Sequence, residues 1–383
     1  MRENIPSMTT RTRVLLALLT TGLLLPALAY AAPYPGLYEA RVPVADQSAA
    51  ARKGALQQAL SAVLIRITGV RQVTGPLAAI LPNAGQYVQQ YHYESAPPDP
   101  NAPPAAAGSL NQAPALVLWA RFDATVVGQA VRAAHMPLWG PERPRTLLWL
   151  ALQEGSSARL LSAGDASPLV QDLLAAAQQR GIELVLPQMD GPDRNALGVP
   201  DITNSNLDRI RAASARYRAD AVLVGSITPF GSGQYAARWQ LLSATGLDSW
   251  QTPPGDESVT ALDGVHNAAD RYAHTLAIAA DAGELDGVPL AVDGITSLDA
   301  YAKVLAYLNN LTPVRAVRVL KVEQGSVYYS VDVHGSLDNL QSAALLGGLL
   351  APGDAETAVP AATGAAPAGI PAAPLRYRYR PAP

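Results

Sequence analysis

Alternating and helix-period hydrophobic patterns divide the chain into three predicted modules. In the amino-terminal module, residues 32–142, the run Leu37–Val44 alternates as a half-buried strand does. At about 100° per residue, the next apolar positions share one face of a predicted helix, and they are Leu56, Leu60, Val63 and Ile67. Two further strand-like runs, Tyr87–Tyr93 and Ala115–Phe122, flank residues 95–114, a proline-rich segment without a period that predicts a long loop.

The middle module, residues 143–287, alternates apolar runs with helical patterns. The runs Thr146–Leu152, Ile182–Leu186 and Ala221–Ile227 are typical of strands that are buried on both faces. Their alternation with helices predicts an α/β arrangement with a mostly parallel sheet and right-handed crossovers. Two later strand-like segments within residues 234–251 predict an antiparallel extension of that sheet.

The carboxy-terminal module, residues 288–383, follows a different order. A strand ending at Ile295 precedes a predicted helix whose apolar face is formed by Leu298, Tyr301, Leu305 and Leu308. A hairpin around Gln324-Gly325, a second helix and a final strand at residues 375–380 complete a ferredoxin-like β-α-β-β-α-β pattern. Residues 351–374, rich in Ala and Pro, form a predicted excursion before that last strand. The whole chain is therefore predicted to combine α+β and α/β modules.

The amino-terminal segment has the features of a secretory signal peptide, residues 1–31. Arg11 and Arg13 precede the apolar run Val14–Leu25, and Ala29-Tyr30-Ala31 provides the small residues before a cleavage site. The apolar segment is shorter than the roughly 20 residues that span a bilayer. We therefore expect export, cleavage after Ala31 and a periplasmic mature chain that has no membrane-spanning helix.

Composition narrows the classes of function. Charged residues make up 15% of the chain, the formal net charge is −3 and there is no cysteine. This composition excludes disulfides, thiolate metal sites and cysteine nucleophiles, and it does not fit a basic nucleic-acid-binding protein. No cofactor is expected.

Four residues of one predicted helix have the types and spacing of a metal site. Asp263, His266, Asp270 and His274 follow each other at intervals of three or four residues, so they share one helical stripe. The opposite side of the helix carries the apolar positions, so this stripe is interpreted as an ordinary polar face in water. The metal interpretation is kept only as the weaker alternative.

Two other segments have patterns that are associated with ligand binding or catalysis. Residues 231–236, Gly-Ser-Gly-Gln-Tyr-Ala, match a variant of the dinucleotide fingerprint, but a strand-like run follows them instead of a helix, which favours a hairpin turn. The carboxyl ends of the middle strands, at Gln188–Asp193 and Gly225–Thr228, are where parallel sheets bind ligands. A hydrolase site there would use the nearby carboxylates Asp190, Asp193 and Asp201.

The final strand alternates arginine with tyrosine. Arg376, Arg378 and Arg380 would lie on one face, and Tyr377 and Tyr379 on the other. One interpretation is an edge strand with its tyrosines inward and its charges in water. The other is peripheral contact of the arginines with an anionic envelope polymer or lipid.

Several segments resemble a known family. LYEARVPVADQSAAARKGALQQALSAVLIRITG, LWARFD and RYRADAVLVGSI are similar to an uncharacterised envelope family of Gram-negative bacteria, domain of unknown function 2066. RYRADAVLVGSI also resembles small α/β modules such as the TolB amino-terminal domain, the curli secretion protein and penicillin-binding-protein activators. The second resemblance implies partner binding, with Gly225 allowing a close turn after the strand.

Three functions remain open at this stage. Linked modules without an assembled catalytic set favour a non-enzymatic envelope protein that binds or assembles other proteins, through its sheet edges and its carboxy-terminal strand. An envelope hydrolase with its site at the middle sheet is the alternative. A small-solute-binding protein is the second alternative.

Overall fold

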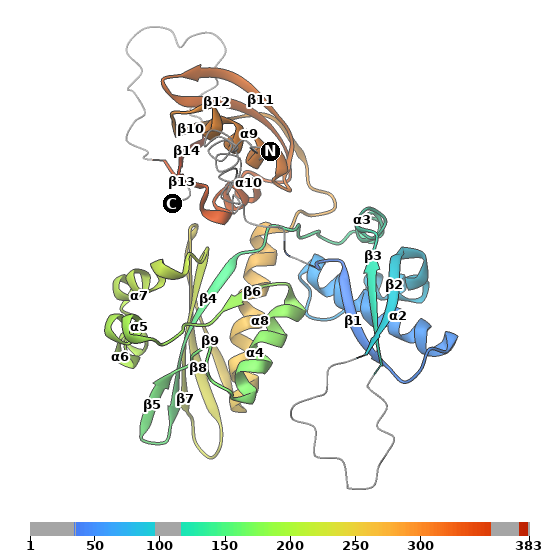
Figure 1. The fold of residues 1–383 in the computed structure, drawn as a ribbon, viewed down its shortest axis with the longest axis vertical. Coiled ribbons are helices and arrows are strands. Elements are labelled where there is room, and N and C mark those ends of the chain that lie inside the picture. The colour runs from blue at the N-terminus through green and yellow to red at the C-terminus, as the bar shows by residue number, and fades with distance from the viewer. Residues whose placement is uncertain (1–33, 35, 96–115, 354–374, 382–383) are drawn as a thin grey trace, which may run out of the picture.

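The computed structural model describes residues 34, 36–95, 116–353 and 375–381 (Figure 1). Residues 1–31, residues 96–114 of the predicted loop and residues 354–374 of the predicted excursion lie outside the described residues. The described chain combines helices with three antiparallel or mixed sheets, which confirms the α+β class. No described helix has both the length and the apolar character needed to cross a bilayer.

The amino-terminal module is a three-stranded antiparallel sheet with helices on one face. Its strand order is β1-β3-β2. The helix α2 begins after the cap residue Ser48 and ends at Gly69, and the predicted apolar positions Leu60, Val63 and Ile67 are fully buried in its packing face. The elements are β1 (Glu39–Val44), α2 (Ala49–Thr68), the 3₁₀ segment η1 (Gly75–Tyr87), β2 (Val88–Ser95), β3 (Leu116–Phe122) and α3 (Ala124–Ala133).

The middle module is built on a six-stranded mixed sheet. Strand β4 pairs in parallel with β6 and β7 and in antiparallel with β5, and the order continues through β8 to β9 with antiparallel pairs. The elements are β4 (Arg145–Glu154), β5 (Ser157–Leu160), α4 (Pro168–Arg180), β6 (Glu183–Val185), α5 (Gly191–Ala196), α6 (Val199–Thr203), α7 (Leu207–Ser214), η2 (Ala215–Tyr217), β7 (Ala221–Pro229), β8 (Tyr235–Ser243), β9 (Gly246–Gly255) and α8 (Glu257–Leu276).

The two faces of this sheet are covered to different extents. On one face, α4 and α8 pack over β4, β7 and β8, where Leu150, Leu223 and Trp239 are buried. On the other face, α6 and α7 cover β4 and β7, as the buried side chains Trp149 and Val224 indicate. Strands β8 and β9 extend beyond these short helices, and much of their half of that face is exposed.

The carboxy-terminal module has the predicted order of elements and one additional strand. Its sheet order is β11-β12-β10-β14-β13. Strand β14 runs parallel to its neighbour β10. In a ferredoxin-like sheet the last strand would run antiparallel to the first. Here the additional strand β13, which is antiparallel to β14, has that direction. The elements are β10 (Glu284–Ile295), α9 (Leu298–Asn310), β11 (Val314–Glu323), β12 (Gly325–His334), α10 (Leu337–Ala344), η3 (Leu346–Gly348), β13 (Leu350–Pro352) and β14 (Leu375–Tyr379).

The final strand is not an edge strand, which corrects one sequence interpretation. Strand β14 has hydrogen-bonded neighbours on both sides, because β13 covers the edge that the sequence pattern left open. The inward direction of Tyr377 is confirmed, since this ring is 4% exposed within the module core. Arg376 lies on the opposite face, where its guanidinium is 3.4 Å from the carboxylate of Asp293. Of the other two predicted contact arginines, Arg378 is paired with Asp293 in the strand register and Arg380 follows the strand.

Candidate binding site on the middle sheet

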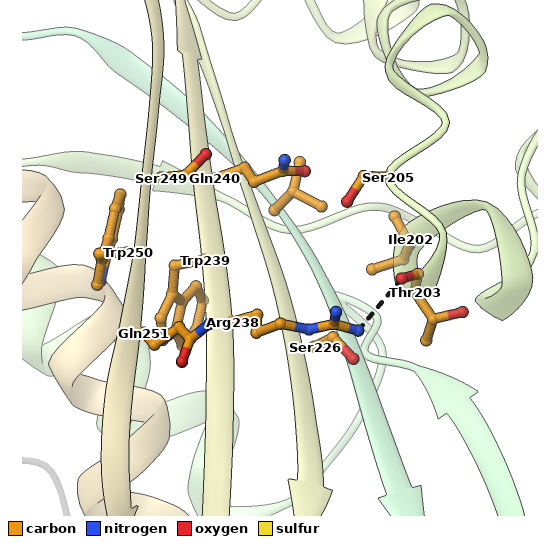
Figure 2. A pocket seen from close by; sticks show the side chains of 11 residues that line it. Ile202, Thr203, Ser205, Ser226, Arg238, Trp239, Gln240, Ser249, Trp250 and Gln251 are labelled. Atoms are coloured by element: carbon orange, nitrogen blue, oxygen red, sulfur yellow. Dashed lines mark hydrogen bonds between the residues drawn. The ribbon is translucent and has the colours of Figure 1, made fainter.

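The exposed half of the middle sheet contains a hollow of about 460 Å³ (Figure 2). The carboxy-terminal end of α6 forms one wall, and β7, β8 and β9 form the floor. Because β-strand side chains alternate, the residues that β8 and β9 place on this face are cross-strand partners, Arg238 with Gln251 and Gln240 with Ser249. The lining residues are Ile202, Thr203, Ser205, Val224, Ser226, Arg238, Trp239, Gln240, Ser249, Trp250 and Gln251.

The lining of the hollow mixes polar and apolar side chains and carries one formal charge, the guanidinium of Arg238. This side chain extends across the floor toward α6, where its Nη2 donates to the carbonyl oxygen of Thr203 at 3.3 Å (Figure 2). Ser226 lies beside it, Gln240 and Ser249 line another part of the hollow, and no carboxylate belongs to the lining (Figure 2). Such a surface offers hydrogen bonds and one positive charge to a polar or acidic ligand.

Strand β9 borders the hollow and is the last strand of its sheet. Its outer edge therefore has main-chain N–H and C=O groups without a neighbouring strand in the described part of the chain. Leu247, which is 44% exposed, lies on the same face as the hollow. Pro253 and Pro254 limit pairing at the far end of the strand. The free edge is thus confined to about its first half.

The carboxylates considered for a hydrolase site form internal contacts instead. Asp190 caps α5 and makes a two-point ion pair with Arg216, at 2.7 and 2.8 Å. Asp201 accepts from the main-chain N–H of Gly198 at 3.0 Å and lies 3.3 Å from Arg209. Both carboxylates are therefore used to hold short helices in place.

The third of these carboxylates, Asp193, is almost fully buried, at 1% side-chain exposure. It accepts from Arg216 at 2.8 Å, from the main-chain N–H of Met189 at 2.9 Å and from the hydroxyl of Tyr217. The Arg216 side chain holds the pKa of Asp190 down at about 2, and burial, followed by the Asp193 hydrogen bond, raises the pKa of Tyr217 to about 12. The hydrogen-bonding groups of Asp190, Asp193, Arg216 and Tyr217 are used within this cluster, which therefore holds α5 against η2.

Gly225 lies in the middle of β7 and not in a turn after it, which corrects the role implied by the resemblance. A Cβ at this position would lie 2.3 Å from the indole of Trp239 and 2.7 Å from Leu150. A Cβ at Gly264 of α8 would likewise lie 2.3 Å from the indole of Trp239. The two glycines therefore make room for a buried tryptophan between sheet and helix.

Two residues of the predicted metal stripe of α8, Asp263 and Asp270, contact Arg71 of the amino-terminal module. Asp270 accepts from Arg71 at 2.8 Å and from Arg180 at 2.6 Å, and Asp263 lies 3.4 Å from Arg71. Burial and these two arginines lower the pKa of His266, while His274 is exposed. Within the described ranges, no group of three His, Asp or Glu side chains is arranged to hold a metal ion. The carboxylates serve as an ion-pair bridge between modules.

The remaining motif residues lie in a turn. The segment that matched the dinucleotide fingerprint connects β7 to β8, and Gly231 and Gly233 both have a φ of 75°. The main-chain N–H of Phe230 donates to Gln234 at 2.7 Å, closing this hairpin. The predicted glycine turn is confirmed.

Sequence reasoning missed the hollow itself. One signal was present, because Arg238 and Gln240 alternate with Ala237, Trp239 and Leu241 along β8 and indicate a polar face. The wall of the hollow had no such signal, since α6 has only five residues and shows no measurable hydrophobic period.

Taken together, these features describe an α+β protein with three sheets and a hollow beside a free sheet edge. Residues 31–140 match a family described as a domain of unknown function (DUF8605), which covers less than a third of the 383 residues. This fits the expectation of an uncharacterised family, although the matching family is neither domain of unknown function 2066 nor a TolB-like module. No curated protein matches the chain.

Proposed function

We propose that this chain is an exported, periplasmic protein without enzymatic activity, which binds or assembles other envelope proteins. It accepts an extended segment of a partner along the free edge of β9. The mature chain begins at Ala32 in this proposal.

The observation that carries the proposal is the position of β9 beside the hollow. A partner strand would pair with the main-chain groups of residues 246–251, as in other cases of strand addition. Its alternate side chains would lie on the same face as Leu247, Ser249 and Gln251. The main chain would supply affinity and the hollow would supply selectivity, with Arg238 favouring an acidic side chain.

The proposed absence of catalysis is supported by the contacts of the candidate carboxylates. Asp190, Asp193 and Asp201 are engaged with arginines and main-chain amides that stabilise short helices. A hydrolytic carboxylate needs a free oxygen near the reacting group, within hydrogen-bond reach.

Site-specific photo-crosslinking in intact cells tests this function. A photoreactive amino acid at Leu247 of β9 should form adducts with a discrete partner, because the side chain lies on the binding face. The matched control places it at Leu174 of α4, which is exposed to a similar extent, 38% against 44%, but lies on a helix. The substitution Arg238→Glu should reduce the adduct at Leu247, because it reverses the one charge in the hollow.

Equal adducts at both positions, or none at Leu247, would contradict the proposal. A small-solute-binding function would instead leave crosslinking at Leu247 absent. It would be recognised by a solute that co-purifies with the wild type and is lost from Arg238→Glu, since a hollow of about 460 Å³ is within the usual size of a small-molecule site.

A further inference from the structure

One end of the carboxy-terminal module exposes a group of aliphatic side chains. Leu298 is 82% exposed and Val322 is 64% exposed, the highest values among the described large hydrophobic residues. Leu320 and Val319 of the same strand are 45% and 37% exposed. The sequence pattern placed Leu298 on the packing face of its helix, and this prediction is wrong because the residue lies in the first turn, beyond the buried positions Ala300 and Val304.

The topology brings these side chains to the same end of the module. Strand β10 ends at Ile295, directly before α9 begins, so Leu298 lies at that end of the sheet. The register pairs Asp293 with Ser326 and Ser326 with Glu323, so the end of β11 lies at the same level as the end of β10, with the start of β12 between them. Strands β11 and β12 lie on the side of the module away from the middle module (Figure 1).

Basic side chains outnumber acidic ones around this aliphatic end. Strand β14 runs parallel to β10, so its carboxy-terminal residues reach the same end of the sheet. The basic residues are Lys303, Lys321, Arg376, Arg378 and Arg380. The acidic residues are Asp293, Asp299 and Glu323, and they form ion pairs with Arg376, Lys303 and Lys321, so the excess is two positive charges. Exposed aliphatic groups surrounded by an excess of positive charge are complementary to the surface of an anionic bilayer.

We infer that this end of the carboxy-terminal module is a docking surface for an anionic membrane. Leu298 and Val322 enter the boundary between headgroups and acyl chains, where their exposed area leaves water. The net positive charge of this end, with Arg380 beyond the end of β14, attracts the lipid phosphates. The contact is peripheral and uses a surface separate from β9.

A second copy of the chain is a poorer occupant of the same surface. Strand β11 is an edge strand, but its ladder with β12 is interrupted by register shifts between Val314 and Ala316 and between Val319 and Lys321. Bulges and edge charges disfavour regular pairing between edges.

Vesicle flotation with the exported protein, isolated as it accumulates in cells, tests this inference. Wild type should bind vesicles of mixed phosphatidylglycerol and phosphatidylcholine, bind pure phosphatidylcholine more weakly, and be released by salt. The double variant Leu298→Asp, Val322→Asp should lose roughly tenfold or more in partitioning. The control Val259→Asp changes an aliphatic side chain that is 61% exposed on α8 and should leave binding unchanged.

The charge contribution has its own pair of variants. Lys321→Gln and Arg380→Gln should each reduce binding to the anionic vesicles by roughly fivefold. The control Lys53→Gln, on α2 of the amino-terminal module, should have no effect. Circular dichroism and thermal unfolding should show that every variant is folded like the wild type.

The inference is overturned by any of three results. These are no binding of wild type to anionic vesicles, equal binding to both vesicle types, or unchanged binding of Leu298→Asp, Val322→Asp. A change from dimer to monomer in that variant would also overturn it, because the surface would then be an interface between copies. Crosslinking at Leu247 is independent of each of these outcomes.

Discussion

At the junction between the amino-terminal and middle modules, buried arginines bind main-chain carbonyls, whereas the junction with the carboxy-terminal module uses smaller polar groups. Arg180, at 1% side-chain exposure, donates to the carbonyl of Gly69 at 2.7 Å and to Asp270 at 2.6 Å. Arg143 lies 3.6 Å from the centre of the Trp139 ring and donates to the carbonyl of Arg66 at 3.0 Å. Burial lowers the pKa of Arg143 to about 9.

The second junction is made of hydrogen bonds to half-buried carboxylate, hydroxyl and amide side chains. Glu142 accepts from the main-chain N–H of Thr312 at 2.9 Å and also from its hydroxyl. The carboxylate of Asp220 accepts from the N–H groups of Gly347 and Arg145, both at 2.8 Å. The amide of Asn339 donates to the carbonyl of Thr275 at 2.8 Å.

This difference between the two junctions indicates which of them resists separation of its modules. A buried guanidinium that has lost its partners cannot be rehydrated without opening the junction, so its removal or exposure is costly. Half-exposed hydroxyl and amide groups can exchange their partners for water at little cost. We therefore expect the first junction to be rigid and the second to open more readily.

The substitution Arg180→Ala should have the largest effect on stability. It removes the buried donor to Gly69 and Asp270 and leaves a cavity between α4 and α8, so the free energy of unfolding should fall by about 3 kcal/mol. Urea unfolding followed by tryptophan fluorescence measures this change. The control Arg159→Ala, which removes two ion pairs at the surface, should cost less than about 1 kcal/mol. An equal loss of unfolding free energy in the two variants would contradict the prediction that the buried arginine contributes more than the surface one.

Glycine substitutions compare the two junctions directly. Gly69→Ala introduces a Cβ at a φ of 75° and 2.2 Å from the Cβ of Ala273, so it should cost about 2 kcal/mol. Gly140→Ala meets the hydroxyl of Thr312 at 2.1 Å and the Thr312 Cβ and Glu142 carboxylate at 2.8 Å, so these half-buried side chains must shift and lose hydrogen bonds, at about 1 kcal/mol. Gly54→Ala, with no atom within 4 Å, should be neutral or stabilising. A greater loss for Gly140→Ala than for Gly69→Ala in thermal unfolding would reverse the predicted order.

The same contrast between local and distant contacts explains how much could be predicted from sequence. The packing face of α2 and the buried strands β4 and β7 were predicted because a hydrophobic period records burial along a single element. The partners of Asp270 were not predicted, because Arg71 and Arg180 are 199 and 90 residues away in the chain. A helical wheel separates polar from apolar faces but does not distinguish water from another module.

The candidate site was harder to predict than the fold. The polar positions Arg238 and Gln240 on β8 were visible as an alternation, but the hollow exists only because α6 ends before it covers them. The extent to which a short helix covers a sheet depends on loop lengths and tertiary packing, which no local pattern encodes.

The pH dependence of Asp220→Asn tests the second junction with the smallest expected effect. Burial raises the pKa of Asp220 above its usual value near 3.8, ahead of the opposing effect of the N–H donors of Arg145 and Gly347. The folded state therefore binds this proton more tightly than the unfolded state, so the contribution of Asp220 to stability falls as pH rises through the window between the two pKa values. The asparagine variant has no such proton.

The free energy of unfolding of wild type minus that of Asp220→Asn should thus be larger near pH 4 than at about pH 7. Urea titrations at a series of pH values measure this difference, and the carboxylates common to both proteins cancel. Asp281→Asn, at an exposed carboxylate, provides the comparison variant, and its difference from wild type should change less over the same range. A difference for Asp220→Asn that grows as pH rises would mean that its two N–H donors outweigh burial. The second junction would then be held by charge, as the first one is.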